Sequence, residues 1–262
     1  MRSDHLAPAL QEWSADLQAA TGFLTRVPLG RFAPGEPADM ARATRAYPLV
    51  GAGIGLAGAG AFWLATVLGL PGLIAGLIAV AATMLFTGAL HEDGLADVAD
   101  GFGGGRDRAG KLEIMRDSRI GAYGVAALVL SIGLRAAALG ELGAAESAGL
   151  VLIAAHAVSR ALLPAAMTVL PLARSSGLAA ATGRPSQAQA ITALLLALVI
   201  ALVITVGLGS GAGLAAFAAA ALGAVLVCWL AQAQIGGYSG DVLGAVQQAA
   251  ETVFLLAVVA LT

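Results

Sequence analysis

Residues 188–208 read AQAITALLLALVIALVITVGL, a run without a single charged side chain. A helix needs about 20 mostly apolar residues to cross a bilayer, and lipid leaves its backbone no other hydrogen-bond partners. Six further segments have the same character: 49–70, 71–90, 121–140, 148–172, 212–233 and 243–262. The sequence therefore predicts an all-α, polytopic membrane bundle of about seven transmembrane helices.

The composition is that of a chain that lies mostly in lipid. Of the 262 residues, 59% are hydrophobic and 11% are charged, whereas soluble domains carry about 25% charged residues. The mean hydropathy is +0.87. These values exclude a soluble globular domain and a disordered chain, and a net charge of −2 provides no basic field for nucleic acid. The single cysteine, Cys228, excludes a disulfide scaffold and is expected to pack as a small apolar residue.

The chain has no internal repeat and no low-complexity linker, so we treat residues 1–262 as one membrane-embedded domain. In the N-terminal segment 1–48, apolar residues recur at helical spacing: Leu6, Leu10, Trp13, Leu17 and Leu24. Glu12 and Asp16 fall away from this stripe, which predicts an amphipathic helix in the membrane interface or against the bundle. The acidic residues also argue against a signal peptide.

The basic residues predict an orientation. Three alternate loops hold all but two of the 14 Lys and Arg residues: 1–48, 91–120 and 173–187. The opposite loops hold none: those near 70, 141–147 and 209–211. Because basic loops stay in the cytoplasm, the N-terminus and the polar loops are expected inside the cell and the C-terminus outside. This arrangement favours an enzyme with cytosolic substrates.

The sharpest polar signal is residues 91–101, His-Glu-Asp-Gly-Leu-Ala-Asp-Val-Ala-Asp-Gly. Asp93, Asp97 and Asp100 are spaced i, i+4, i+7, which places three carboxylates on one helix face. Mg²⁺ usually takes one or two carboxylates plus substrate phosphates, so a metal site is predicted; a solvated acidic face is the alternative. Glu92 points about 100° away and is a secondary ligand or base. His91 is a general acid or base, or a polar cap at the membrane interface.

Glycines and basic residues follow these carboxylates. Three glycines precede Arg106: Gly103, Gly104 and Gly105. They suit a phosphate cradle because glycine permits close backbone approach to a ligand; a simple flexible loop is the alternative. The rest of the loop carries Lys111, Arg116 and Arg119. Arginine suits bidentate phosphate recognition, although the positive-inside rule also accounts for basic residues here.

Three more polar residues need an explanation. Asp241, just before the last span, either caps that helix or supplies another carboxylate to the site. Arg135 and Arg160 lie inside predicted spans, where a charge is costly and needs a partner. Glu251 in the last span is a candidate partner for Arg160, and a structural ion pair is the simplest interpretation.

Five segments carry a resemblance to a known family. They are Phe-Leu-Thr-Arg-Val-Pro at 23–28, Tyr-Pro-Leu-Val-Gly at 47–51, residues 91–105, Glu-Ile-Met-Arg-Asp-Ser-Arg-Ile-Gly at 113–121 and Gly-Gly-Tyr-Ser-Gly-Asp at 236–241. In this order, over nearly the whole chain, they resemble cobalamin synthase, also called adenosylcobinamide-GDP ribazoletransferase. The block 91–121 is the most specific part. Tyr238 and Ser239 depart from the Val and Thr that the family often has there.

The resemblance implies a Mg²⁺-dependent enzyme of the cytoplasmic (inner) membrane. It would transfer the cobinamide phosphate moiety of adenosylcobinamide-GDP to α-ribazole or α-ribazole 5′-phosphate. GMP and adenosylcobalamin, or its 5′-phosphate, would be the products, which is the nucleotide-loop assembly step of vitamin B12 biosynthesis. Besides these substrates and the lipid bilayer, the expected partners are other corrinoid-assembly enzymes and a second copy in a homo-oligomer; nucleic acid is not one.

The predicted site residues fall into three groups. The catalytic group is His91, Asp93, Asp97, Asp100 and Asp241. The metal-binding group is Glu92, Asp93, Asp97 and Asp100. The group that binds substrate or phosphate is Arg26, Gly103, Gly104, Gly105, Arg106, Lys111, Arg116, Asp117 and Arg119.

Two other functions stay open on the sequence. A CDP-alcohol phosphotransferase also uses an acidic membrane-helix motif, and residues 97–101 match its opening, but Gly104 and Gly105 replace the Ala-Arg pair that should follow. A cation or proton transporter would use the same acids as an ion site. It predicts acids near the membrane midplane and an inverted repeat, and neither is evident in the sequence.

Overall fold

The computed structural model describes residues 6–28 and 37–262, and within these residues it is all-α. Residues 1–5 and 29–36 of the N-terminal segment lie outside the described residues. The α-helices are α1 (Leu6–Leu24), α2 (Pro37–Ala43), α3 (Tyr47–Val67), α4 (Gly72–Thr87), α5 (Leu90–Gly104), α6 (Arg108–Ile114), α7 (Ala122–Glu141), α8 (Ala145–Val169), α9 (Leu178–Ala181), α10 (Gln187–Gly207), α11 (Ala212–Ile235) and α12 (Gly240–Leu261). A 3-10 turn, Thr44–Ala46, joins α2 to α3.

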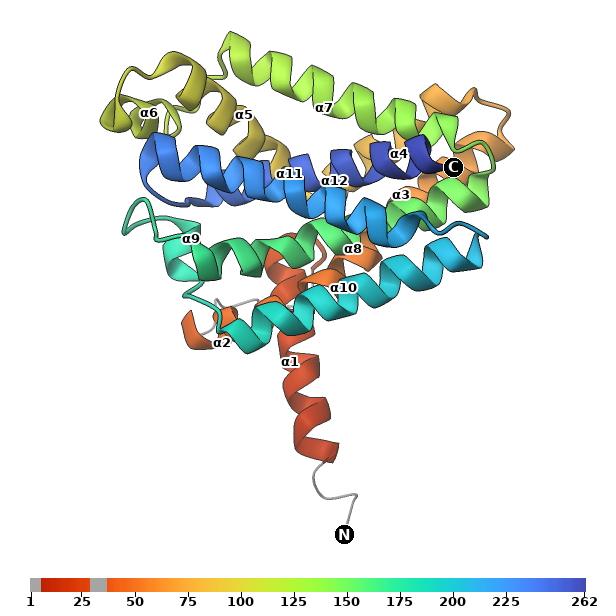
Figure 1. Cartoon of the computed structure of the whole chain (residues 1–262), viewed down its shortest axis with the longest axis horizontal. Helices are drawn as coiled ribbons and strands as arrows, with labels where there is room; N and C mark the ends of the chain where they lie inside the picture. The colour runs from red at the N-terminus through yellow and green to blue at the C-terminus, as the bar shows by residue number, and fades with distance from the viewer. Residues whose placement is uncertain (1–5, 29–36) are drawn as a thin grey trace.

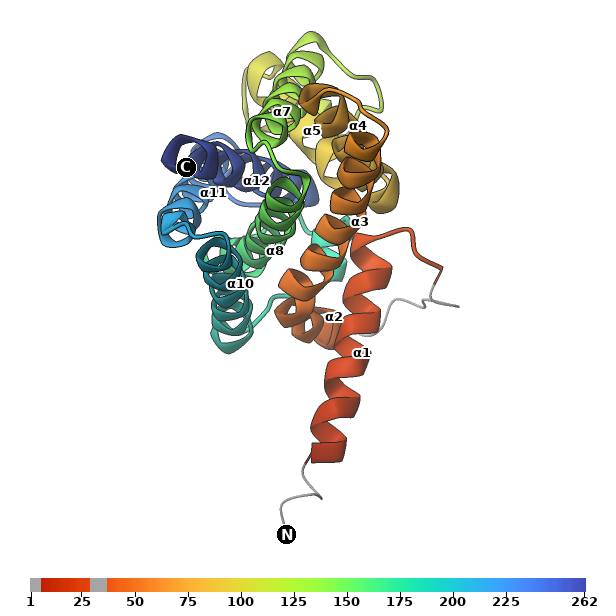
Figure 2. The ribbon, with the colours of Figure 1, turned by 90° about the vertical axis from the view of Figure 1, so that its right-hand side faces the viewer.

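The long helices run side by side as a bundle, with α8 at its centre (Figures 1 and 2). Most of α8 is buried, and it packs against α3, α10 and α12. Six helices of the described chain are long and apolar enough to span a membrane by themselves; α4 and α5 reach that length only together, with a 96° bend between them. The all-α multi-pass prediction is confirmed. The predicted second span, 71–90, is shorter than expected because α4 ends at Thr87.

The outer surface of the bundle is apolar. Large exposed side chains on the peripheral helices include Leu64, Val129, Val199, Val203, Val225 and Trp229. Such a surface is unfavourable in water but suits contact with lipid chains. The chain is therefore a multi-pass membrane protein.

Small residues bring the spans together. A Cβ atom on Gly51 would collide with the backbone oxygen of His156, and one on Gly76 would collide with the backbone of Ala136. These contacts join α3 to α8 and α4 to α7. Close backbone approach is how helices gain packing energy in lipid, where the hydrophobic effect is absent between them.

A sharp break separates α4 from α5. Gly88 closes α4 in the left-handed conformation (φ 70°), and Ala89 follows with φ 57°. A left-handed non-glycine residue is strained, which marks a position that the surrounding structure enforces. Arg26 lies over this break: its backbone N–H donates to the Phe86 oxygen at 2.9 Å, and its side chain occupies the space where a Cβ of Gly88 would be. The break redirects the chain into the helix that carries the acidic motif.

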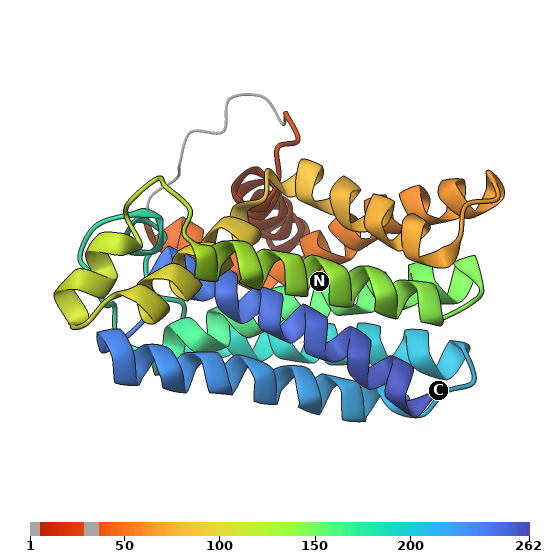
Figure 3. The same cartoon turned by 90° about the horizontal axis from the view of Figure 1, so that it is seen from above.

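The segment 91–120, predicted as a loop, is mostly helical. It forms α5 and α6, which lie at the same end of the bundle as α2 and α9 (Figure 3). The glycines expected to form an open cradle continue α5 through Gly104, and Gly105 has an extended backbone with negative φ. We treat α5 as lying beyond the spans, because it turns away from α4 and carries three aspartates.

Helix α1 crosses the bundle at a steep angle and leaves its N-terminal half away from the other helices (Figure 2). Its contacts with α2 and α3 place part of α1 against the bundle, which is one of the two predicted positions. Asp16 lies off the apolar stripe but is nevertheless buried. It is 1% exposed and accepts hydrogen bonds from Arg42 (2.9 Å) and Arg45 (2.6 Å). The Arg45 guanidinium also lies 4.4 Å from the centre of the Trp13 ring. Two ion pairs therefore fasten α1 to α2 and to the 3-10 turn that precedes α3.

Candidate active site

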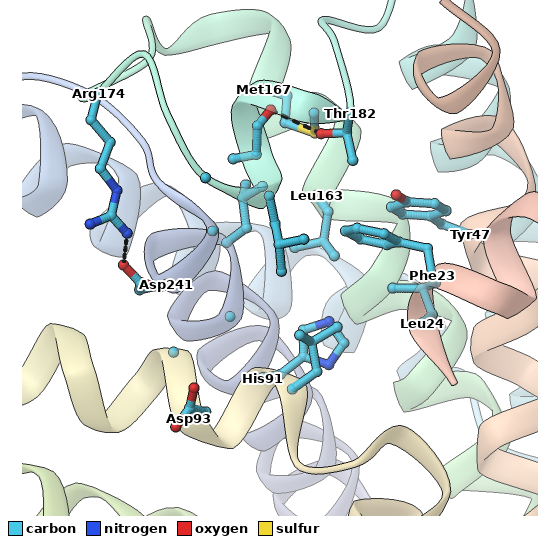
Figure 4. A pocket seen from close by; sticks show the side chains of 18 of the residues that line it. Phe23, Leu24, Tyr47, His91, Asp93, Leu163, Met167, Arg174, Thr182 and Asp241 are labelled. Carbon is cyan, nitrogen blue, oxygen red and sulfur yellow. Dashed lines mark hydrogen bonds and ion pairs between the residues drawn. The ribbon is translucent and has the colours of Figure 1, made fainter. Parts of the chain in front are cut away.

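A cavity of about 280 Å³ lies at the end of the bundle where α5, α8 and α12 meet. The end of α1, the start of α3 and the segment around α9 complete its wall. Figure 4 shows that it has two unlike ends: charged side chains gather at one end, and aromatic and aliphatic side chains at the other.

The charged end is formed by Asp93, Arg174 and Asp241. Arg174 Nη2 donates to Asp241 Oδ2 at 2.5 Å, and both side chains are mostly buried. Ser239, rather than Asp241, caps α12: its hydroxyl accepts from the Val242 N–H at 3.3 Å and donates to Asp241 Oδ2 at 3.1 Å. The capping alternative for Asp241 is therefore wrong, and its carboxylate is free to orient the guanidinium at the cavity.

Two distant loop segments hold Arg174 in place. The Tyr238 N–H donates to the Pro171 oxygen and the Ala173 N–H donates to the Tyr238 oxygen, both at 2.8 Å. A Cβ on Gly237 would strike the Pro171 oxygen, so glycine is required there. Arg108 of α6 completes the support by donating to the oxygens of Ile235 (2.8 Å) and Ala173 (3.0 Å).

The apolar end contains Phe23, Tyr47, Leu163 and Met167. The rings of Phe23 and Tyr47 are stacked, with centroids 6.2 Å apart and planes at 11°. His91 lies between this end and the carboxylates (Figure 4). Its side chain is 3% exposed, and Nδ1 has no hydrogen-bond partner within the described chain. A buried polar atom without a partner is costly, which makes His91 a candidate ligand contact.

A second cavity, of about 290 Å³, lies on the other side of Asp93. Its polar wall brings together five of the predicted site residues: Asp93, Asp97, Arg116, Asp117 and Arg119. Arg119 Nη2 donates to Asp117 Oδ2 at 2.6 Å, and this exposed guanidinium lowers the pKa of Asp117 to about 2. Residues of the acidic motif and the downstream arginines therefore line the same cavity, and Asp93 lines both cavities.

Asp97 lies near Asp93 and Asp241, of which only Asp241 is paired with a guanidinium. Its pKa is raised to about 7, first by burial and then by the negative charges of Asp93 and Asp241. In the described part of the chain, Asp93 and Asp97 accept no hydrogen bond and form no ion pair. Repulsion among such carboxylates is relieved by a cation.

The predicted four-carboxylate ligand set does not come together. Within residues 6–28 and 37–262, no group of three or more His, Cys, Asp or Glu side chains is close enough to hold a metal ion. Asp100 is turned to the start of α7, where its oxygens accept from the N–H groups of Gly121 (2.7 Å) and Gly124 (2.9 Å). Asp93 and Asp97 remain, and two carboxylates plus substrate phosphates suffice for Mg²⁺.

Glu92 points into the bundle instead of toward Asp93. It belongs to a buried charge cluster formed by Glu92, Arg135, Arg160 and Glu251. Arg135 contacts Glu92 at 3.2 Å and Glu251 at 3.0 Å, and Arg160 donates to Glu251 at 2.6 Å. The predicted pairing of Arg160 with Glu251 is confirmed. Because two carboxylates face two guanidinium groups, the cluster is internally compensated.

The other six predicted substrate-binding positions line neither cavity: Arg26, Gly103, Gly104, Gly105, Arg106 and Lys111. Arg26 supports the α4–α5 break, and Arg106 is exposed. A Cβ on Gly103 would strike the Tyr123 ring, and one on Gly105 would strike Lys111. These glycines serve the packing of α5 in the described chain.

Sequence reasoning missed Arg174 and the aromatic pair as parts of a cavity. Arg174 lies in the basic loop 173–187, and no spacing rule connects it to Asp241, 67 positions later. Phe23 and Tyr47 each lie in a segment that carries the family resemblance, which was the available signal.

Fold and site together define a class: a helical membrane protein with paired carboxylate- and arginine-lined cavities at one end of its bundle. Comparison with known proteins narrows the class. The model of the family described as cobalamin-5-phosphate synthase matches residues 16–259, so the chain belongs to this family.

Three relatives share the name adenosylcobinamide-GDP ribazoletransferase. The protein from Bradyrhizobium diazoefficiens is 47% identical over 242 residues, covering 92% of both chains. That from Azorhizobium caulinodans is 48% identical, covering 93% of this chain and 95% of the relative. That from Mesorhizobium japonicum is 45% identical, covering 94% of both. No solved structure matches the chain.

Proposed function

We propose that this chain transfers the cobinamide phosphate group of adenosylcobinamide-GDP to α-ribazole or α-ribazole 5′-phosphate, with release of GMP. Its family and the names of its relatives support this activity. The structural observation that carries the proposal is the junction of two cavities at Asp93, one lined by arginines and one with an apolar end. A reaction between two substrates needs two sites that meet at the reacting atoms.

The chemistry is attack of a ribose hydroxyl on the phosphorus that carries cobinamide. A new P–O bond forms, the bond to the bridging oxygen of the diphosphate breaks, and GMP leaves with that oxygen. Arg116 and Arg119 line the cavity that would take the diphosphate, where their charge opposes that of its oxygens. The hydroxyl proton passes to Asp93 or to His91 Nδ1, the two groups in the neighbouring cavity that can accept it.

Mg²⁺ fits the remaining carboxylates. Asp93 and Asp97 would hold it together with substrate phosphates, and their uncompensated charge is the observation that favours a cation there. When bound, it would neutralise charge that develops on the phosphate oxygens.

The test is GMP release by the purified protein in liposomes, with adenosylcobinamide-GDP, α-ribazole 5′-phosphate, and either Mg²⁺ or EDTA. We expect GMP and the cobalamin phosphate only with Mg²⁺, and loss of both in Asp97→Asn. Asp107→Asn is the matched control, because Asp107 caps α6 through Gly110 N–H at 2.8 Å and asparagine caps equally well. Absence of product from the folded wild-type protein would refute the proposed activity.

We also propose that the cavity end of the bundle faces the cytoplasm, because the basic loops lie there. Single cysteines can test this in a Cys228→Ala background. In intact cells the cysteine of Ser176→Cys should not react with a membrane-impermeant thiol reagent. The cysteine of Ser210→Cys, in a loop at the opposite end of the bundle, should react. The reverse pattern would place the site outside.

A further inference from the structure

The cavity of Figure 4 contains two buried polar atoms that the described chain leaves without partners: Arg174 Nη1 and His91 Nδ1. Arg174 uses Nη2 for Asp241, so one edge of its planar guanidinium is held by a carboxylate while Nη1 is unoccupied. Since unmade hydrogen bonds of buried groups cost stability, both atoms point to a ligand in this cavity.

The remaining wall limits what that ligand can be. Phe23, Leu163 and Met167 offer an apolar surface opposite the charged end, which suits an aromatic ring. A volume of about 280 Å³ is at the small end for ligand sites. A corrin ring is far too large, so the corrinoid donor must lie mainly outside, with its diphosphate toward Arg116 and Arg119.

We propose that this cavity is the subsite for the acceptor nucleoside, and that Arg174 recognises its 5′-phosphate. The proposal rests on the proposed function and specifies which groups of the acceptor are read. The aromatic base of α-ribazole lies at the apolar end, and its ribose lies near His91 and Asp93. Its 5′-phosphate accepts a hydrogen bond from Nη1 of Arg174. Asp241 acts as a positioning residue, because it fixes the guanidinium plane through Nη2.

Equilibrium binding measurements distinguish recognition of the 5′-phosphate by Arg174 from a purely structural role of this residue. The purified protein in nanodiscs is titrated with α-ribazole 5′-phosphate and, separately, with α-ribazole. Loss of a charge-assisted hydrogen bond to a phosphate in Arg174→Met should weaken binding of the phosphorylated ligand roughly 10- to 100-fold. Binding of α-ribazole should change far less, which also reports that the cavity is intact. Arg174→Lys should recover part of the loss.

Arg184→Met is the matched control. Arg184 lies in the same inter-span segment, is exposed and donates to the Thr168 oxygen, but does not line the cavity. It should bind both ligands as the wild type does. Steady-state kinetics add a second readout: Arg174→Met should raise KM for the phosphorylated acceptor and leave KM for adenosylcobinamide-GDP unchanged.

Two results would overturn the proposal. Equal weakening of both acceptors, or a raised KM for the donor instead, would assign Arg174 to the fold or to the transferred diphosphate. Unchanged binding of the phosphorylated acceptor would remove Arg174 from recognition altogether. Because binding is measured without turnover, these results are distinct from the absence of GMP release, which would count against the proposed function.

Discussion

Glu92 and Asp93 are neighbours in the sequence, yet they lie in two regions with opposite electrostatics. Glu92 is 5% exposed and paired with Arg135 inside the bundle. Asp93 is exposed to both cavities and has no partner in the described chain. In the buried charge cluster each charge is compensated by protein, so the cluster supports the fold. At the cavities Asp93 has no partner within the protein, so its charge can interact with a bound ligand. The presence or absence of a protein partner therefore separates the structural role of Glu92 from the functional role of Asp93.

The largest expected effect is on the fold. Glu251→Gln would leave Arg135 and Arg160 facing a single carboxylate inside the bundle, and breaking one side of a buried pair costs about 3–5 kcal/mol. Chemical or thermal unfolding in detergent should show this loss, or no folded protein at all. Glu141→Gln, at an exposed position at the end of α7, is the control and should unfold like the wild type. A fully stable Glu251→Gln protein would contradict the structural role of the cluster.

The adjacent pair gives the most direct contrast. Asp93→Asn should keep the unfolding temperature and lower GMP release by roughly 100-fold or more, as expected for a group that binds metal or moves a proton. Glu92→Gln should lower stability first, because Arg135 and Gln248 lose a charged partner. Both the unfolding temperature and the rate of GMP release are measured for both variants. If the two variants changed in the same way, the distinction between the two regions would be wrong.

A smaller effect is expected from the packing that positions α5 on α12. A Cβ on Gly94 would lie 2.7 Å from the Asp241 oxygen and 2.9 Å from its Cα, so the helices must separate. Gly94→Ala should reduce turnover roughly 10- to 100-fold, since an ångström of misplacement is costly in catalysis. Gly133→Ala on α7, where a Cβ meets nothing within 4 Å, should be neutral. Unchanged turnover in Gly94→Ala would mean that the spacing of Asp93 and Asp241 is unimportant.

The smallest effect concerns stability against pH in metal-free buffer. Because the folded pKa of Asp97 is about 7 and the ordinary value is 3.8, the folded state binds this proton more tightly than the unfolded state. Stability should therefore fall as the pH rises from about 4 to 7, and level off above. Asp97→Asn should remove this slope and be the more stable protein at pH 8. Parallel melting profiles for the two proteins would show that burial and the neighbouring carboxylates do not raise the pKa of Asp97.

Much of this architecture follows from the sequence. Apolar runs long enough to cross lipid predict the spans, and the i, i+4, i+7 spacing predicts that Asp93, Asp97 and Asp100 share one face of a helix. The partner of Arg160 was also predictable, because a charge inside a span admits few alternatives. These inferences succeed because each depends on local spacing or on the cost of burial.

The class of protein, its spans and its candidate site residues follow from the amino-acid sequence alone. The role of each carboxylate depends on tertiary contacts: Glu92 pairs with Arg135, Asp100 caps α7, and Asp93 and Asp97 have no partner in the described chain. The tertiary structure also brought Arg174 to Asp241 and turned the glycine run into helix. The physical reason is that a carboxylate's role depends on the charges and N–H groups around it, and these come from segments far away in the chain.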